Sequence, residues 1–337
     1  MPGLTEPNQT LRREDLANML INVEAEDFPL FSIIPKGAPV KATFHEWGHD
    51  AYAPVKMGGV PDGKDVETFD DKSQRRRRIK GRIQKFRDSY GVGDIAENVS
   101  EVAGVPSEVS KSKMDSLYEL KRNIEVQLGS DDDSNEDDGV DGSVTRGLGS
   151  WISASAQSDL PVPSDYRSRA AQIDTTAMAS VSESTINGVL DQLYTNRKKR
   201  SRYLGVVGTA LKSAISDLTK YDDGVSASVA AIRTFNQDGA SKKIVATIDF
   251  YEGDTGQLEL SLSSWLGYTN ASGSPVQAHG DKRGYVLDID KVEICPNRHP
   301  RHKPLEDKGG GPRGYWDALY LLKVLSPLCH GKFAATS

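Results

Sequence analysis

The sequence has very little cysteine: Cys295 and Cys329 are the only two in 337 residues. They lie far apart and form no C-x-x-C pair. Secreted domains are often held together by several disulfides, whereas cytoplasmic proteins keep their thiols reduced. We therefore expect two free thiols and a chain that folds in a reducing compartment.

Long apolar runs are also missing. The first residues, MPGLTEPNQTLRRED, contain no apolar segment of the kind found in a signal peptide. No later stretch approaches the roughly 18 apolar residues that a membrane-spanning helix needs. We therefore expect neither export nor insertion, and no membrane partner.

Catalytic motifs are scarce, and only one short match to a catalytic signature is present. His45-Glu46-Trp47-Gly48-His49 fits H-E-x-x-H, in which two histidines one helical turn apart bind zinc. Gly48, the nearby Pro39 and Pro54, and the β-favouring residues around them predict a strand instead. Four residues along a strand span about 13 Å, too far for one tetrahedral zinc site. We predict a strand, with a zinc hydrolase as the alternative.

Other potential metal ligands lack a recognised spacing. The cysteines and histidines near the C-terminus match no zinc module, and a solvated loop beside a strand explains them more simply: Cys295, His299, His302, Cys329 and His330. The acidic stretch 133–144 is not an EF-hand, because Gly139 falls one position late and Val144 occupies the place of the closing glutamate. We predict no metal, no cofactor and no enzymatic activity.

Charge is distributed unevenly along the chain. The formal net charge is -6, which excludes a protein that is basic as a whole. Nine lysines or arginines nevertheless fall within 72–87, and seven acids with no base fall within 131–141. The basic segment is suited to phosphates or to an acidic protein surface, and only Phe86 and Tyr90 are placed to stack on bases. Both alternatives stay open.

The hydrophobic pattern predicts a chain that mixes helices and strands. The clearest helix spans about 107–128, where apolar residues recur at three- and four-residue steps along one stripe. Two polar arms at 40–52 and 78–92 flank a Gly/Pro/Asp-rich link and predict a long hairpin. Further helices are predicted at 15–21, 182–197 and 209–219, and further strands at 203–207, 228–235, 243–251, 257–263, 285–294 and 316–325.

Short sequence motifs, spread in order over nearly the whole chain, are similar to those of a known protein family. Examples are FHEW at 44–47 followed by Asp50, ELKRNIE at 119–125, and GLGSWI at 147–152. Others stand at 13–16, 28–31, 249–256, 285–288 and 328–332. Together they resemble the Hong Kong 97-type major capsid proteins of tailed bacteriophages.

The resemblance implies an α+β fold made of five segments. It places an N-terminal arm at 1–38, an extended loop at 39–92, a peripheral domain with the spine helix 107–128 at 93–165, an apical α/β domain at 166–282 and closing peripheral strands at 283–337. In this family the pattern at 44–50 centres on Trp47 and Asp50 and needs neither histidine.

The resemblance also implies a structural function. Such subunits form pentamers and hexamers, lay the extended loop over a neighbour and enclose double-stranded DNA in a virion assembled in the host cytoplasm. Portal, scaffold or decoration proteins would be further partners. A cellular encapsulating shell of the same fold is an alternative.

Candidate assembly residues follow from the motif and from the two charged segments. Trp47 is a large apolar ring in a polar strand, and such rings often dominate an interface. We predict that the interface includes Trp47, Asp50, Arg75, Arg76, Arg77, Arg78, Asp131, Asp132 and Asp133.

Overall fold

The computed structural model describes residues 27–99, 107–218, 236–238, 241–243, 247–269 and 274–336. The predicted helix at 15–21, the strand at 228–235 and most of the predicted arm at 1–38 lie outside these residues. Within them, no helix has the length and apolar character needed to cross a membrane.

The chain divides into two compact units. One combines Arg87–Leu120 with Pro300–Asp317, and the other combines Phe28–Phe86, Lys121–His299 and Ala318–Ser337. The five-segment division expected from the sequence stays a prediction.

A six-stranded sheet with the order β4-β13-β10-β5-β9-β8 forms the core of the second unit. β5 runs parallel to β9 and β13 runs parallel to β4, while the other neighbours are antiparallel. The strands are β4 (Ile173–Asp174), β5 (Ser201–Val207), β8 (Phe250–Glu252), β9 (Gly256–Leu262), β10 (Arg283–Leu287) and β13 (Gly331–Ala334).

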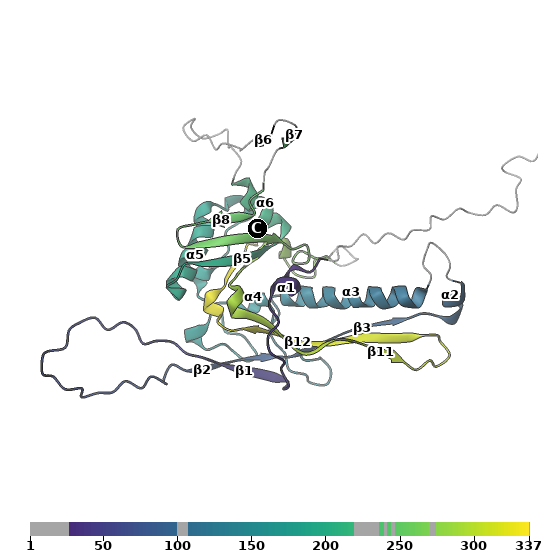
Figure 1. The fold of residues 1–337 in the computed structure, drawn as a ribbon, viewed down its shortest axis with the longest axis horizontal. Coiled ribbons are helices and arrows are strands. Elements are labelled where there is room, and N and C mark those ends of the chain that lie inside the picture. Colours follow the sequence, from purple (N-terminus) through teal and green to yellow (C-terminus); the bar gives the residue numbers. More distant parts are fainter. Residues whose placement is uncertain are drawn as a thin grey trace, which may run out of the picture. The chain divides into compact units, whose positions relative to one another are not determined.

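Two helices pack against this sheet, α5 (Glu183–Arg197) and α6 (Thr209–Asp217) (Figure 1). α5 buries Ile186, Val189, Leu190 and Leu193, which lie on one helical stripe. It ends at Lys198, whose φ of 55° is a left-handed cap. Both helices and the strands predicted at 203–207 and 257–263 are therefore confirmed, whereas the strand predicted at 243–251 is described as a strand only at its two ends.

The predicted spine helix is confirmed as α3 (Glu108–Leu128). Its C-terminal half buries Leu120, Ile124 and Leu128, whereas Met114 is 48% exposed. Glu125 on this helix caps the short helix α1 (Pro29–Ile33), because its carboxylate accepts hydrogen bonds from Leu30 N at 2.8 Å and Phe31 N at 2.7 Å. These bonds satisfy backbone donors that a helix N-terminus leaves unpaired.

The two predicted arms form an antiparallel hairpin that is shorter than expected. β1 (Phe44–His49) pairs with β2 (Arg77–Arg82) from Phe44↔Arg82 to His49↔Arg77. The second arm is not one strand, since Ile83 separates β2 from β3 (Gln84–Gly91), which joins a different sheet with the order β11-β12-β3. The link 50–76 forms no helix or strand.

The C-terminal strands also correct the sequence analysis. The predicted strand 285–294 is interrupted by a turn at Ile289–Lys291, which separates β10 from β11 (Val292–Leu305). His299 and His302 lie on β11 and not in a solvated loop. β11 is an edge strand, where proline residues are tolerated because one row of N–H groups is not needed for pairing. Its partner β12 spans Arg313–Val324.

Candidate assembly interface

We use the name extended loop for the link between β1 and β2, residues 50–76, which reaches beyond the hairpin (Figure 1). Its large apolar side chains are solvated: Tyr52 99%, Val55 85%, Met57 92%, Val60 77%, Val66 71% and Phe69 87% exposed. Apolar groups gathered in this way on one surface segment mark an interaction site. The loop therefore carries apolar surface that the chain itself does not bury.

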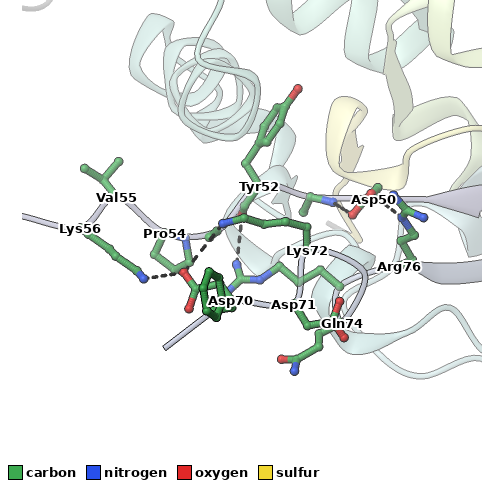
Figure 2. Close-up of a pocket in the computed structure, with 14 residues that line it drawn as sticks. Asp50, Tyr52, Pro54, Val55, Lys56, Asp70, Asp71, Lys72, Gln74 and Arg76 are labelled. Atoms are coloured by element: carbon green, nitrogen blue, oxygen red, sulfur yellow. Dashed lines mark hydrogen bonds and ion pairs between the residues drawn. The ribbon is translucent and has the colours of Figure 1, made fainter. Parts of the chain in front are cut away.

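Exposed polar contacts connect the two limbs of the extended loop (Figure 2). Lys56 Nζ lies 2.5 Å from Asp70 Oδ2, and Arg76 Nε lies 3.0 Å from Asp50 Oδ2. The limbs line an open groove of about 1010 Å³, and every residue of 50–76 is exposed. Exposed ion pairs contribute little, about 0–1 kcal/mol each. These exposed contacts alone therefore do little to fix the conformation of the loop.

The root is held where the loop begins and ends. His49 Nε2 lies 3.0 Å from Ser326 Oγ, and its ring centroid is 4.1 Å from that of Tyr166. The Tyr166 hydroxyl donates a hydrogen bond to the carbonyl oxygen of Arg75. Burial lowers the pKa of His49, so the neutral ring is favoured at this contact. Tyr166 therefore contacts the chain at both ends of the extended loop, through His49 before it and Arg75 near its end.

Trp47 lies near this root on β1, and its side chain faces its own chain. It is 8% exposed and sits opposite Ile79 in the hairpin. Its ring centroid is 5.7 Å from that of the fully buried Trp151. A role in assembly stays a prediction, and the geometry makes any such role indirect, through the placement of the hairpin.

Four arginines of the basic segment, Arg75–Arg78, are exposed, and each contacts a group of its own hairpin or loop. Arg76 pairs with Asp50, and Arg78 Nη1 lies 3.2 Å from Glu46 Oε2. Arg75 and Arg77 donate to the carbonyl oxygens of Tyr52 and Gln74 at 3.0 and 2.8 Å. The Arg76 and Arg78 side chains are 69% and 78% exposed. They therefore remain available to a partner.

The acidic segment is already engaged within the chain. Asp131 lies 2.5 Å from both Lys332 Nζ and Arg283 Nη2. Asp133 lies 2.7 Å from Arg146 Nε. Asp132 is exposed. The structure gives these three aspartates different surroundings, which their adjacency in the sequence does not reveal.

The H-E-x-x-H residues lie on β1, so the predicted strand is confirmed. The His45 ring stacks on Trp47 at 6.0 Å. Burial lowers the pKa of His45. Among the residues that the structure describes, no three His, Cys, Asp or Glu side chains gather in a way that would hold a metal ion.

Both cysteines are free and buried, which confirms the prediction of two free thiols. Burial raises the pKa of Cys295 to about 11 and also raises that of Cys329. A thiol with a raised pKa is a poor nucleophile at neutral pH. These two side chains therefore act as packing groups.

Comparison with known proteins agrees with this arrangement. A family model described as SU10 major capsid protein matches residues 4–337. The chain belongs to this family. It is therefore a structural protein of a bacteriophage virion, a subunit that self-assembles into capsomers of an icosahedral shell. A search of curated proteins by sequence finds no significant match.

Solved capsid structures share the fold of this capsid subunit. The cyanophage A-1(L) capsid is 12% identical and has a TM-score of 0.67, with 99% of this chain and 100% of that chain covered. The Mycobacterium phage Adephagia chain is 10% identical with a TM-score of 0.61, and 99% of this chain and 98% of that chain are covered. The cyanophage P-SCSP1u capsid chain is 12% identical with a TM-score of 0.59, and 99% of this chain and 97% of that chain are covered. The expected α+β fold of the Hong Kong 97 type is confirmed.

Three residues near the root of the extended loop carry no signal in the sequence: Arg82, Arg146 and Asp159. Arg82 stood within the basic segment but was not distinguished from its neighbours. The side chains of Arg82 and Arg146 are 11% and 1% exposed. No local pattern separates a buried arginine from a solvated one, so only the tertiary contacts identify them.

Proposed function

We propose that the capsid subunit builds its shell through the extended loop and performs no catalysis. The shell encloses double-stranded DNA, and portal, scaffold or decoration proteins are further partners. Assembly takes place in the host cytoplasm. In this proposal segment 39–92 is the extended-loop segment of the family fold and contains both the hairpin and the loop 50–76. Segments 93–165 and 166–282 serve as peripheral domain and apical domain, with the arm at 1–38 and the closing strands at 283–337.

The observation that carries this proposal is the apolar surface of the extended loop. Six large apolar side chains on one loop are at least 71% exposed. Burying apolar surface contributes roughly 25 cal/mol per Å², so a neighbour that covered them would gain substantial free energy. In a closed shell the same contact repeats at every equivalent boundary, and small contributions add up.

Charge complementarity sets the orientation of this contact. The Arg75–Arg78 run reaches an acidic surface of an adjacent subunit, in which Asp131 and Asp132 are exposed and Asp133 is half-buried. Asp131 and Asp133 contribute while they keep their pairs with Lys332 and Arg146. Networks of exposed charges favour one register over others even when each pair is weak.

A second candidate for the basic run is packaged DNA on the inner face of the shell. The side chains of Arg76 and Arg78 are largely exposed, and a cluster of such groups neutralises phosphates without regard to base sequence. Both partners would make the contact sensitive to salt. Reversal of the arginine charges separates the protein partner from the DNA partner.

Electron microscopy of the purified subunit tests the proposed function. Wild-type protein is expected to form shells, tubes or rings. Replacing residues 54–69 with a short Gly/Ser linker is expected to leave a folded, soluble subunit that does not assemble, because the β1–β2 pairs lie outside this segment. Tyr194→Ala, on the helix α5 and 41% exposed, serves as a control that removes an exposed ring elsewhere. Wild-type protein that stays monomeric under all conditions would contradict the proposal.

A further inference from the structure

Arg82 occupies the corner at which the chain leaves the hairpin. It is the last residue of β2 and pairs with Phe44, and only Ile83 separates it from β3. The orientation of the hairpin, and of the extended loop that continues it, is therefore set at this corner. The Arg82 side chain points inward and is 11% exposed.

Arg82 makes a two-pronged ion pair with a distant loop. Its Nε lies 2.7 Å from Asp159 Oδ2, and its Nη2 lies 3.2 Å from Asp159 Oδ1. The same Nη2 lies 3.0 Å from Glu136 Oε2. A guanidinium bound through two nitrogens to one carboxylate has little rotational freedom, so this contact fixes direction as well as distance.

The loop that presents Asp159 is itself held by Arg146. This guanidinium is almost completely buried and bonds to Asp133 at 2.7 Å, to Ser134 Oγ at 3.3 Å and to the carbonyl oxygen of Leu160 at 3.2 Å. The second carboxylate oxygen of Asp133 accepts from the N and Oγ of Ser158 at 2.6 and 2.8 Å. These bonds hold the loop that carries Asp159 at a defined position, and they do not involve Arg82.

Apolar packing alone does not define the same direction. The hairpin rests on Trp151 through the Trp47 ring, and such contacts are not directional. Ion pairs of low exposure add little net stability but can select one geometry among several. The Arg82–Asp159 pair supplies a directional contact at the corner where the chain leaves the hairpin, whereas the His49–Ser326 and Tyr166–Arg75 contacts lie at the opposite, loop end.

We infer that Arg82 is a positioning residue for shell assembly: through Asp159 it orients the hairpin, and with it the extended loop, before a neighbouring subunit binds. The relevance to assembly rests on the proposed function of the extended loop, whereas the orienting contact does not. The acidic segment at 131–138 then has an internal role, since Asp133 and Glu136 belong to this support.

Distance measurements between two spin labels on the unassembled full chain test this inference. One label is attached at Ala51→Cys, at the exposed loop end of the hairpin, and the other at Asp254→Cys, in the exposed turn before β9. Cys295 and Cys329 are buried and escape labelling. The compared variants are Arg82→Gln, Asp159→Asn and the double variant, and the control is Arg78→Gln, whose side chain is 78% exposed on the same strand.

Each single variant is expected to broaden the distance distribution and to lower the yield of shells at least fivefold. The double variant should add little to either single change, because both remove the same contact. Arg78→Gln should leave the distribution narrow. Should Arg82→Gln fail to fold, Asp159→Asn and Arg82→Lys provide the same comparison.

Unchanged distributions in folded Arg82→Gln and Asp159→Asn would overturn the inference. So would a loss of shells with an unchanged distribution, because Arg82 would then act by touching a neighbour directly. A wild-type chain that formed no shells would contradict the proposed function and leave the distance measurement interpretable.

Discussion

The rings of Trp47 and Trp151 lie with their centroids 5.7 Å apart and their planes 46° apart. Trp151 is fully buried, and the Arg146 guanidinium lies 4.6 Å from its ring centroid. Through the Trp47 ring the hairpin packs against Trp151, which in turn contacts Arg146. One aromatic contact therefore connects the root of the extended loop to the buried arginine that supports Asp159.

Replacing Trp47 with alanine is expected to weaken the attachment of the hairpin. Removal of a buried tryptophan ring costs about 3–5 kcal/mol when the surroundings do not collapse. We expect a soluble subunit with reduced resistance to urea and few shells by electron microscopy. Phe44→Ala, on the same strand but 44% exposed, should have a much smaller effect. Normal shells from Trp47→Ala would refute an assembly role for this residue.

Changing Arg75, Arg76, Arg77 and Arg78 to glutamate is expected to block the assembly of empty shells. The reversed charges would face Asp50 and Glu46 within the hairpin and the acidic surface of a neighbour, and both contacts would become repulsive. The measurement is the yield of empty shells from purified protein at low and at physiological salt.

Compensating changes on the acidic segment distinguish a protein partner from DNA. Reversal of Asp131 to Asp133 to lysine should partly restore assembly, but the single change Asp132→Lys is the sharper test because it spares the ion pairs of Asp131 and Asp133. Empty shells that form normally with the glutamate run and then fail to retain DNA would favour the genome-facing alternative.

Acid is expected to destabilise the subunit through His330. This ring is fully buried, accepts a hydrogen bond from Asp288 N at 3.2 Å, and lies 3.3 Å from the carbonyl oxygen of Lys291. Burial lowers the pKa of His330 from 6.5 to about 4. The unfolded chain therefore binds the proton more readily. The stability from this residue is complete above pH 6.5 and falls as the pH drops toward 4, by roughly 3 kcal/mol in total.

Urea unfolding at pH 7.5 and pH 5 measures this effect. The difference in unfolding free energy between wild type and His330→Gln should shrink at the lower pH. His279→Asn is the control, at an exposed histidine whose φ of 56° asparagine also adopts. A constant difference across this range would show that His330 does not titrate as its burial implies.

The purified subunit is expected to hold no zinc in the H-E-x-x-H segment. The two histidines are four residues apart on β1, and His49 contacts Ser326 and Tyr166. Elemental analysis of the dialysed protein should find zinc far below one ion per chain. One tightly bound ion per chain that disappears in His45→Ala would support the zinc hydrolase alternative.

The sequence by itself determined the elements whose signals are local. The apolar stripe of α3, the stripe of α5 and the β-favouring residues of 44–49 each predicted the correct element, because helical and strand periodicity are properties of neighbouring residues. The order of the short sequence motifs along the chain also indicated the capsid family. The strand boundaries near 83 and 289 were missed, since pairing partners far along the chain decide where a strand ends.

Only the tertiary structure decided which charged and aromatic residues are solvated. Arg82 and Arg78 belong to one basic segment, yet one is 11% and the other 78% exposed in its side chain. The acidic segment looked like a surface for a partner, and much of it pairs with Arg146, Lys332, Arg283 and Arg82. These assignments depend on contacts between residues up to 201 positions apart, and no local pattern records which distant side chain will arrive to neutralise a charge.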